Sequence, residues 1–374
     1  MVRATAVFVG SMLGAGIFGL PYAFAQAGWG IGALYLVGVG FVLLLLQLLI
    51  AEVTIQTPGE RRLSSLAGLY LGRWAKVVTT ILIFGSVWGA VLAYIILGGG
   101  FLYTLFGGWL GGDPIWYAGV FVAFEALLIS FPLRKAAGME VLIGGVLLCL
   151  FVVLILAGLP EIHIVNITST NATHWFVPYG VVLFALSGLG VSPEMHNIFG
   201  ERSEHHMPRA ILVGFSLVFA LYAAFTFVVV GVSGDGVTQN ALLGYTMALD
   251  PLMQVVGSLV GLLTISSILF MMGEQLKDTM IADYEVPPGV AEAVTLGVPF
   301  LFFLLGLRDL VSVIGFVGAV FSALTAVMFI FVYERLRKNV CRHVKCFTVP
   351  RALTMFIGLV FVAGAIVQIV QDLL

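Results

Sequence analysis

The stretch Gly14-Ala15-Gly16-Ile17-Phe18-Gly19-Leu20-Pro21 lies in the middle of the first apolar segment, where a helix that merely anchors a chain would carry leucine. Three glycines and one proline in eight residues weaken an α-helix at this depth. Backbone groups freed by such a break cannot bond to lipid, so the break is tolerated only where it faces protein or a water-filled cavity. The sequence therefore predicts a non-helical backbone near residues 14–18, with a binding site beside it.

The composition identifies an integral membrane protein, so the lipid bilayer is its first partner. Of 374 residues, 61% are hydrophobic and only 10% are charged, and the mean hydropathy is +1.13. The net charge of -2 gives no indication of nucleic-acid binding, and we expect none. The oligomeric state is not determined by these numbers.

The three cysteines predict no disulfide framework and no cofactor. Cys341 and Cys346 flank His343 in a basic loop, which is a weak zinc signal because only three candidate ligands are present.

Apolar segments long enough to cross a bilayer predict an all-α polytopic protein of about eleven transmembrane helices in one domain over residues 1–374. A short interfacial helix is expected in the loop at 57–73. The eleven segments lie at 4–29, 31–56, 74–106, 115–132, 137–159, 176–199, 209–231, 251–275, 289–306, 310–333 and 350–371.

The positions of the basic residues predict the orientation of the chain in the cell membrane. If the N-terminus is in the cytoplasm and the C-terminus outside, 16 of the 17 Lys and Arg residues fall on the cytoplasmic side, and Arg308 is the exception. A wrong number of helices would have disrupted this alternation.

The sixth span carries a second break, Ser187-Gly188-Leu189-Gly190-Val191-Ser192-Pro193, followed by Glu194. An offset of five helices inverts one unit relative to the other, which is typical of an inverted-topology repeat with a site at the membrane midplane. The repeats would cover about 4–159 and 176–333, with an extra helix at about 350–371. The alternative is that these glycines serve close helix packing.

The segment Gly10-Ser11-Met12-Leu13-Gly14-Ala15-Gly16-Ile17-Phe18-Gly19-Leu20-Pro21-Tyr22-Ala23-Phe24 resembles the first helix of amino acid permeases. The resemblance is to the amino acid/auxin permease and aromatic amino acid permease families of the amino acid-polyamine-organocation superfamily. It implies a core of five plus five inverted helices, with helices 1 and 6 broken. The chain departs from these families in its short N-terminal end, which leaves Arg3 for an inner gate.

An amino acid substrate brings a carboxylate and an amine to the midplane, and both need partners there. Unpaired N–H groups near Gly14, Ala15 and Gly16 lie at the positive end of a helix dipole and suit the carboxylate. Carbonyl groups freed near Phe184 and the second break suit the amine, and small residues there leave room for the ligand. The second-break residues concerned are Ser187, Gly188 and Gly190. By resemblance, Tyr94 in the third span lies beside the substrate, although ordinary packing is an equal alternative.

The resemblance also implies a sodium site between helices 1 and 8. Thr264 and Ser267 share one helix face, opposite the carbonyl groups of Gly10 and Leu13. The alternative is that both hydroxyl groups bond only to their own helix. Some relatives replace sodium with a lysine in the fifth helix, but residues 137–159 contain no lysine.

Three glutamates, Glu52, Glu125 and Glu194, lie at membrane depth, where each is costly unless paired or water-facing. Glu194 adjoins the second break, so it either braces that backbone or carries a proton. At the cytoplasmic mouth, Arg3 is expected to pair with Glu274 or Asp278 as a gate.

The sequence therefore predicts a secondary active transporter for amino acids, coupled to sodium and working by alternating access. A proton-coupled amino acid carrier and a carrier-fold amino acid sensor remain as alternatives. A channel is disfavoured because no span has a continuous polar stripe. An enzyme is not expected, since neither paired aspartates at depth nor a His-Glu-x-x-His motif occurs.

Overall fold

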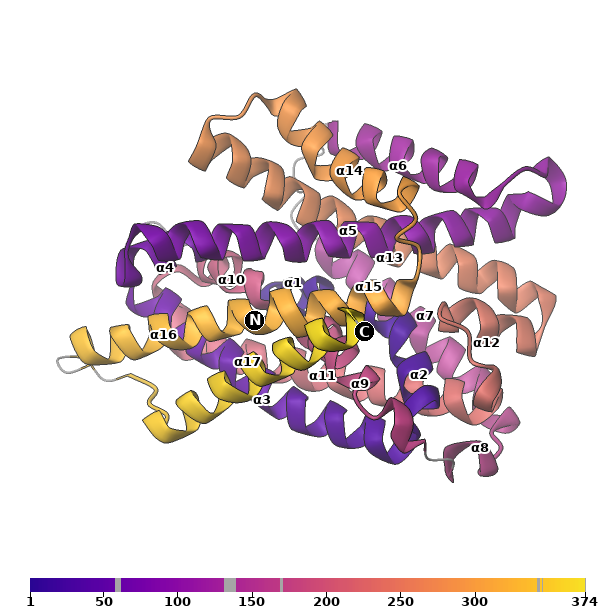
Figure 1. The fold of residues 1–374 in the computed structure, drawn as a ribbon, viewed down its shortest axis with the longest axis horizontal. Coiled ribbons are helices and arrows are strands. Elements are labelled where there is room, and N and C mark those ends of the chain that lie inside the picture. The colour runs from indigo at the N-terminus through magenta and orange to yellow at the C-terminus, as the bar shows by residue number, and fades with distance from the viewer. Residues whose placement is uncertain (58–61, 131–138, 169–170, 342–343, 345, 374) are drawn as a thin grey trace.

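The computed structural model describes residues 1–57, 62–130, 139–168, 171–341, 344 and 346–373, and this part of the chain is helical with no strand (Figure 1). The α-helices are α1 (Val2–Met12), α2 (Gly16–Ala27), α3 (Trp29–Gln56), α4 (Leu63–Leu71), α5 (Arg73–Leu110), α6 (Pro114–Ser130), α7 (Met139–Gly158), α8 (Val165–Thr168), α9 (Val177–Leu186), α10 (Ser192–Phe199), α11 (Ser203–Ser233), α12 (Ala241–Leu249), α13 (Pro251–Tyr284), α14 (Pro288–Leu304), α15 (Leu310–Phe316), α16 (Ala323–Asn339) and α17 (Arg351–Leu373). Short 3₁₀ turns η1 to η5 lie at Leu159–Glu161, Ala172–His174, Leu189–Val191, Gly200–Arg202 and Gly234–Gly236, and the π-helical segment η6 (Val317–Ser322) joins α15 to α16.

The eleven expected spans all have counterparts among the described helices. Eight are long and apolar enough to cross a membrane, and the bent pair α1 and α2 makes a ninth. The remaining two, α6 and α14, are apolar but only 17 residues long each. The all-α polytopic fold is thereby confirmed, while the inverted relation between the two repeats stays a prediction.

The first span is broken, but slightly earlier than expected. α1 ends at Met12 and α2 begins at Gly16, and the two helices are bent by 52°. The break therefore covers residues 13–15, whereas Ile17 and Phe18 are already helical. α2 can begin at Gly16 because this residue has no side chain and lies directly against the backbone of Ala185 in α9.

The second break lies where the Gly-rich segment predicted it. α9 ends at Leu186, and Gly188 has a φ of +32°, a conformation that favours glycine. The 3₁₀ turn η3 follows, and α10 starts at Ser192, so Ser192 itself is helical. Pro193 is tolerated because it lies in the first turn of α10, where its missing N–H would have no partner.

The two broken spans form the centre of the molecule. α2 packs against α9, α1 packs against α11, and α9 also contacts α3 and η6. α2 is largely buried, with Ile17, Phe18, Leu20 and Phe24 fully shielded. Elongated helices surround this centre, and in Figure 1 α5 runs across its whole length beside α13.

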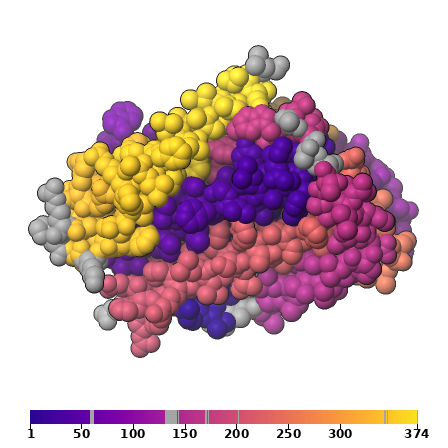
Figure 2. Space-filling view, turned by 90° about the horizontal axis from the view of Figure 1, so that it is seen from below, coloured from indigo at the N-terminus to yellow at the C-terminus, as the bar shows by residue number. Residues whose placement is uncertain are grey.

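The outer surface carries the apolar side chains expected of lipid-facing helices. In Figure 2, α17 (yellow), α3 (indigo) and α11 (salmon) make up one face of the molecule. Large exposed apolar residues on these three helices include Leu34, Val37, Phe41, Leu212, Leu217, Phe356 and Leu359. In water such a surface would aggregate, so it indicates contact with lipid.

Two local expectations have clear outcomes. The interfacial helix of the 57–73 loop is α4, with Leu66 buried and Leu69 exposed. The expectation of no disulfide was wrong, since Cys341 and Cys346 are bonded to each other with their Cα atoms 5.5 Å apart. This bond removes both thiolates from a zinc site, and His343 lies outside the described residues.

Candidate functional site

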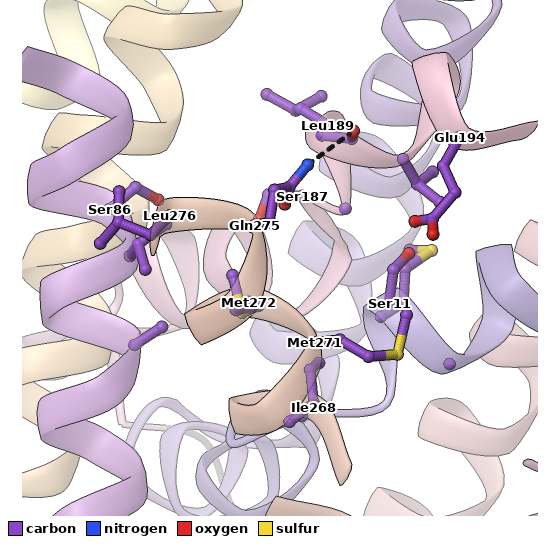
Figure 3. A pocket seen from close by; sticks show the side chains of 18 of the residues that line it. Ser11, Ser86, Ser187, Leu189, Glu194, Ile268, Met271, Met272, Gln275 and Leu276 are labelled. Atoms are coloured by element: carbon purple, nitrogen blue, oxygen red, sulfur yellow. Dashed lines mark hydrogen bonds between the residues drawn. The ribbon is translucent and has the colours of Figure 1, made fainter. Parts of the chain in front are cut away.

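A cavity of about 770 Å³ lies between the two broken spans and extends to one end of the molecule (Figure 3). Both breaks contribute to its wall, together with α5, α13 and the η6–α16 region. Of the predicted substrate-binding residues, all but Ala15 line it, namely Gly14, Gly16, Tyr94, Phe184, Ser187, Gly188 and Gly190. Residues from segments far apart in the sequence therefore meet in one space.

At the first break, two backbone N–H groups have no carbonyl partner among the described residues. Leu13 N–H bonds to the carbonyl of Val9 and Gly14 N–H to that of Met12, but Ala15 and Gly16 donate no backbone hydrogen bond within the described chain. Both groups lie at the start of α2, where the helix dipole is positive. This arrangement can hold a carboxylate without a charged side chain.

Tyr94 contacts the first break, as the resemblance implies. Its side chain is 2% exposed, and a Cβ placed on Gly14 would lie only 2.6 Å from its hydroxyl oxygen. That hydroxyl also lies beside the backbone of Ala15 and contacts the sulfur of Met272 at 3.8 Å. The Tyr94 hydroxyl and the backbone of Ala15 are therefore bonded to each other at the first break, beside the N–H of Gly16.

The amine site differs in detail from the expectation. The Phe184 carbonyl accepts hydrogen bonds from the N–H and hydroxyl of Ser187, and the Ser187 carbonyl accepts one from Gln47. By contrast, no backbone hydrogen bond from the described residues reaches the carbonyl of Ala185, which also lines the cavity. This carbonyl is better placed to accept from an ammonium group.

Two buried side chains that the sequence analysis missed satisfy carbonyls at the breaks. The Gln47 amide of α3 donates to the Ser187 carbonyl at 2.7 Å, and the Tyr222 hydroxyl of α11 donates to the Met12 carbonyl. Both residues are 0% exposed. A lone amide inside the leucine-rich run of residues 43–49 was the available signal for Gln47. Such partners are required where a helix is broken away from water.

The glycines of the breaks have different roles. A Cβ on Gly16 would lie 2.4 Å from the Cα of Ala185, so Gly16 serves the packing of α2 on α9 as well as lining the cavity. Gly190 is different, because the nearest atoms to its Cβ position belong to the Gln275 side chain at 3.6 Å. In Figure 3, Gln275 reaches from α13 to the carbonyl of Gly190, at 3.5 Å.

The four predicted sodium ligands line the same cavity. The carbonyls of Gly10 and Leu13 accept no backbone hydrogen bond within the described chain, because α1 ends between them. Thr264 and Ser267 donate to the carbonyls of Val260 and Leu263, each at 2.7 Å. Donation uses the hydroxyl hydrogen and leaves the oxygen lone pairs free, so the four oxygens suit a small hard cation.

The predicted proton and gate residues lie nearer the cavity mouth. Glu194 lines the cavity from the first turn of α10, above Ser11 in the view of Figure 3. Glu274 and Asp278 also line it, from α13. Arg3 is exposed at the start of α1, and the lining on this helix begins at Ala6 instead. A gate formed by Arg3 stays a prediction.

The remaining wall of the cavity is mainly apolar. Ile268, Met271 and Met272 project from α13 beside the first break, as Figure 3 shows, and Leu147 of α7 also lines the cavity. Flexible methionine side chains fill irregular space around an apolar ligand. Beside the first break the polar groups are the backbone, Tyr94 and the α13 hydroxyls, whereas Glu194, Glu274 and Asp278 add charged groups elsewhere in the lining.

These features define a membrane transporter whose site is built on two broken helices. The model of the family described as transmembrane amino acid transporter protein matches residues 1–371. The chain therefore belongs to this family, whose members are transporters and not enzymes.

Three curated relatives carry transporter names. The chain is 23% identical over 349 residues to "Tyrosine-specific transport system 1" of Haemophilus influenzae, which covers 87% of this chain and 86% of the relative. It is 27% identical over 223 residues to "Tyrosine-specific transport system 2" of the same organism, with 58% and 54% covered. Amino acid transporter ANT1 of Arabidopsis thaliana is 24% identical over 229 residues, with 57% and 52% covered.

Solved structures share the fold. MhsT in complex with L-phenylalanine superposes with a TM-score of 0.68 at 16% identity, covering 98% of each chain. The Eremococcus coleocola manganese transporter in complex with an aromatic bis-isothiourea compound also gives 0.68, at 14% identity, with 99% of this chain and 85% of the other covered. One architecture thus carries different cargoes, so the substrate must be argued from the site.

Proposed function

We propose that this chain is a secondary active transporter that carries an amino acid by alternating access. The observation that carries the proposal is the convergence of both helix breaks and Tyr94 on one cavity. The N–H of Gly16, together with Ala15 and its partner Tyr94, would bind the substrate carboxylate, and the carbonyl of Ala185 would bind its amine.

The state described is the inward-facing one in this proposal. The cavity extends toward Arg62, Glu274 and Asp278. This is the end of the molecule where the distribution of Lys and Arg predicts the cytoplasm. The N-terminus is then cytoplasmic in the cell membrane, and the C-terminus is outside.

The substrate side chain is proposed to be apolar or aromatic. Phe184, Ile268, Met271 and Met272 surround the space next to the backbone groups. Apolar walls with few fixed polar groups are typical of sites for such ligands. The names of the tyrosine-specific relatives and of the phenylalanine-bound neighbour agree with this choice.

Sodium is the proposed driving ion. The carbonyls of Gly10 and Leu13 and the hydroxyls of Thr264 and Ser267 supply four oxygens of the kind that sodium binds. The ion would bind to α1 and α13 at the same time. Its binding would therefore favour the conformation in which these two helices lie close enough to share it.

The test is uptake into liposomes that contain the purified full chain. A mixed pool of labelled amino acids is offered with an inward sodium gradient, and choline replaces sodium in the matched control. We expect one or a few apolar or aromatic amino acids to accumulate only with sodium. Binding without accumulation would mean a sensor, and accumulation that is equal in choline but lost when the pH gradient collapses would overturn the sodium assignment.

A further inference from the structure

Glu125 of α6 is a buried acidic side chain with no place in the site described above. It is 0% exposed, and neither carboxylate oxygen forms a hydrogen bond in the described part of the chain. The polar side chain that lies beside it is Ser266 of α13. Apart from the Ser266 hydroxyl, no described side chain compensates a charge on Glu125, and an uncompensated buried carboxylate costs several kcal/mol.

The helices packed against α6 carry several charged groups, namely Glu274, Lys277 and Asp278 on α13, Glu292 on α14, and Arg73 and Lys76 at the start of α5. On α13, Lys277 donates to the Ile129 carbonyl at 3.2 Å and pairs with Glu292 of α14 at 3.4 Å. Lys277 is eleven residues from Ser266, which is about 16 Å along the helix. α5 and α14 also pack against α6. The tyrosines of α5 are Tyr94, which lies at the first break, and Tyr103, which packs edge-on against Tyr117 of α6.

Ser266 connects Glu125 with the cavity. It lines the cavity, although Glu125 does not, and it is the direct neighbour of the proposed sodium ligand Ser267. Leu128, one turn from Glu125 on α6, also belongs to the lining. The carboxyl therefore lies behind a single layer of side chains. A serine hydroxyl both donates and accepts a hydrogen bond, so it can pass a proton between a carboxyl and cavity water.

We propose that Glu125 is a proton-binding site of the transport cycle, which exchanges its proton with the cavity through Ser266 and releases it when a cation binds at Thr264 and Ser267. The balance is simple: the neutral carboxyl becomes a carboxylate, its proton leaves to cavity water, and the incoming cation supplies the compensating charge. A nearby positive charge favours the ionised carboxylate. The inference rests on the proposed cation-coupled transport and adds a counter-moving proton to it.

The test measures protons released by the purified full chain in weakly buffered detergent solution with a pH indicator dye. Sodium chloride is added, with choline chloride as the ionic-strength control, and sodium binding is followed separately as an increase in thermal stability. We expect release of up to about one proton per wild-type molecule with sodium and none with choline. Glu125→Gln should bind sodium without releasing a proton, because the amide has no proton to lose.

The pH dependence provides a second readout. The apparent sodium affinity of the wild type should fall by up to about tenfold per pH unit on acidification, because protons and sodium compete. In Glu125→Gln this dependence should disappear. The matched control is Glu292→Gln on α14, a partly exposed carboxyl paired with Lys277, which should keep the wild-type proton release.

The outcomes separate this inference from the proposed function. If the wild type takes up no amino acid in liposomes, the proposed function fails. The assignment of Glu125 is wrong if the wild type takes up amino acid with sodium but releases no proton. It is also wrong if Glu125→Gln releases as many protons as the wild type. Should Glu125→Gln not fold, Ser266→Ala keeps the carboxyl and removes the relay. Stopped-flow release slower than that of the wild type would then support the proposal, and an unchanged rate would overturn it.

Discussion

The Gln47 side chain of α3 donates a hydrogen bond of 2.7 Å to the Ser187 carbonyl, the first residue beyond the end of α9. This contact joins an unbroken helix to a broken one, and the donating side chain is 0% exposed. The break in the sixth span is thus held by a side chain 140 positions away in the sequence.

Replacing Gln47 with leucine should leave the Ser187 carbonyl without its partner. We expect the free energy of unfolding to fall by about 1–3 kcal/mol and transport to weaken, because a buried acceptor is left unsatisfied. Thermal unfolding in detergent and uptake in liposomes measure the two effects. Gln56→Leu is the control, since Gln56 bonds only to Glu52 in the turn before it. Equal losses in both variants would contradict a specific role for Gln47.

Tyr94→Phe removes one hydroxyl that points at the first break. If this hydroxyl helps to bind the substrate carboxylate, its loss should weaken apparent substrate affinity by roughly tenfold, which corresponds to about 1.4 kcal/mol. The protein should stay folded because the ring remains. Tyr103→Phe, nearer the outer end of α5, provides the comparison and should retain wild-type affinity. An unchanged KM in Tyr94→Phe would mean that this tyrosine only packs.

The glycines of the two breaks should respond differently to alanine. Gly16→Ala should reduce the amount of folded protein, with a cost of about 1–3 kcal/mol, because the new Cβ meets the Ala185 backbone. Gly14→Ala meets mainly the movable ends of Tyr94 and Ile268, so uptake should fall more than folding. Gly190→Ala has room and should be tolerated in both respects. Size-exclusion profiles and uptake, measured on the same preparations, distinguish these patterns.

The sodium assignment predicts opposite outcomes for two residues of the cavity wall. Thr264→Val keeps the shape of the side chain but removes an oxygen, so the sodium concentration for half-maximal uptake should rise several-fold. Glu194→Gln should leave that concentration unchanged, since Glu194 is not among the four oxygens proposed to bind sodium. If Glu194→Gln abolishes sodium dependence and Thr264→Val does not, the two roles must be exchanged.

Asp309, just before α15, predicts a pH effect on stability outside the membrane spans. Burial alone would raise the pKa of Asp309, but the N–H and hydroxyl of Ser312 and the Gln239 amide lower that pKa below its usual 3.8. A carboxyl with a lowered pKa in the folded state stabilises the protein above its unfolded pKa, and this contribution is lost as the pH falls through the folded pKa. Asp309→Asn should therefore narrow the difference in thermal stability between pH 7 and pH 3.

Local sequence signals were sufficient for the fold and for the position of both breaks. Clustered glycines with a nearby proline weaken a helix at membrane depth, so Gly14 and Gly188 could be placed near non-helical backbone from sequence alone. The residues that donate hydrogen bonds to the carbonyls at these breaks could not be predicted from the sequence. Tyr222 and Gln47 act across the packed core, and their partners depend on how α3 and α11 are rotated against the broken helices.

Gly16 is a second case in which the sequence alone did not predict the packing. The position of Gly16 in a Gly-rich run indicated room for a ligand. In the structure, the space that a side chain of Gly16 would need is occupied by Ala185. Sequence spacing identified Thr264 and Ser267 on one face, and both do line the cavity. Ser266 lies between these two residues and also beside Glu125. This second contact arises because α13 packs against α6, and the local sequence does not predict that packing.

The two short helices α6 and α14 have a consequence for the surrounding membrane. α14 rises about 25 Å over its 17 residues, and the described part of α6 has the same length, against a hydrocarbon thickness of about 30 Å. They contact each other and lie along the same edge of the molecule in Figure 1, next to the 38-residue α5. The lipid on this flank has to thin or its headgroups have to dip, at a cost of fractions of a kcal/mol per ångström. The flank would therefore favour short-chain lipids, or a neighbouring protein with equally short spans, over the rest of the bilayer.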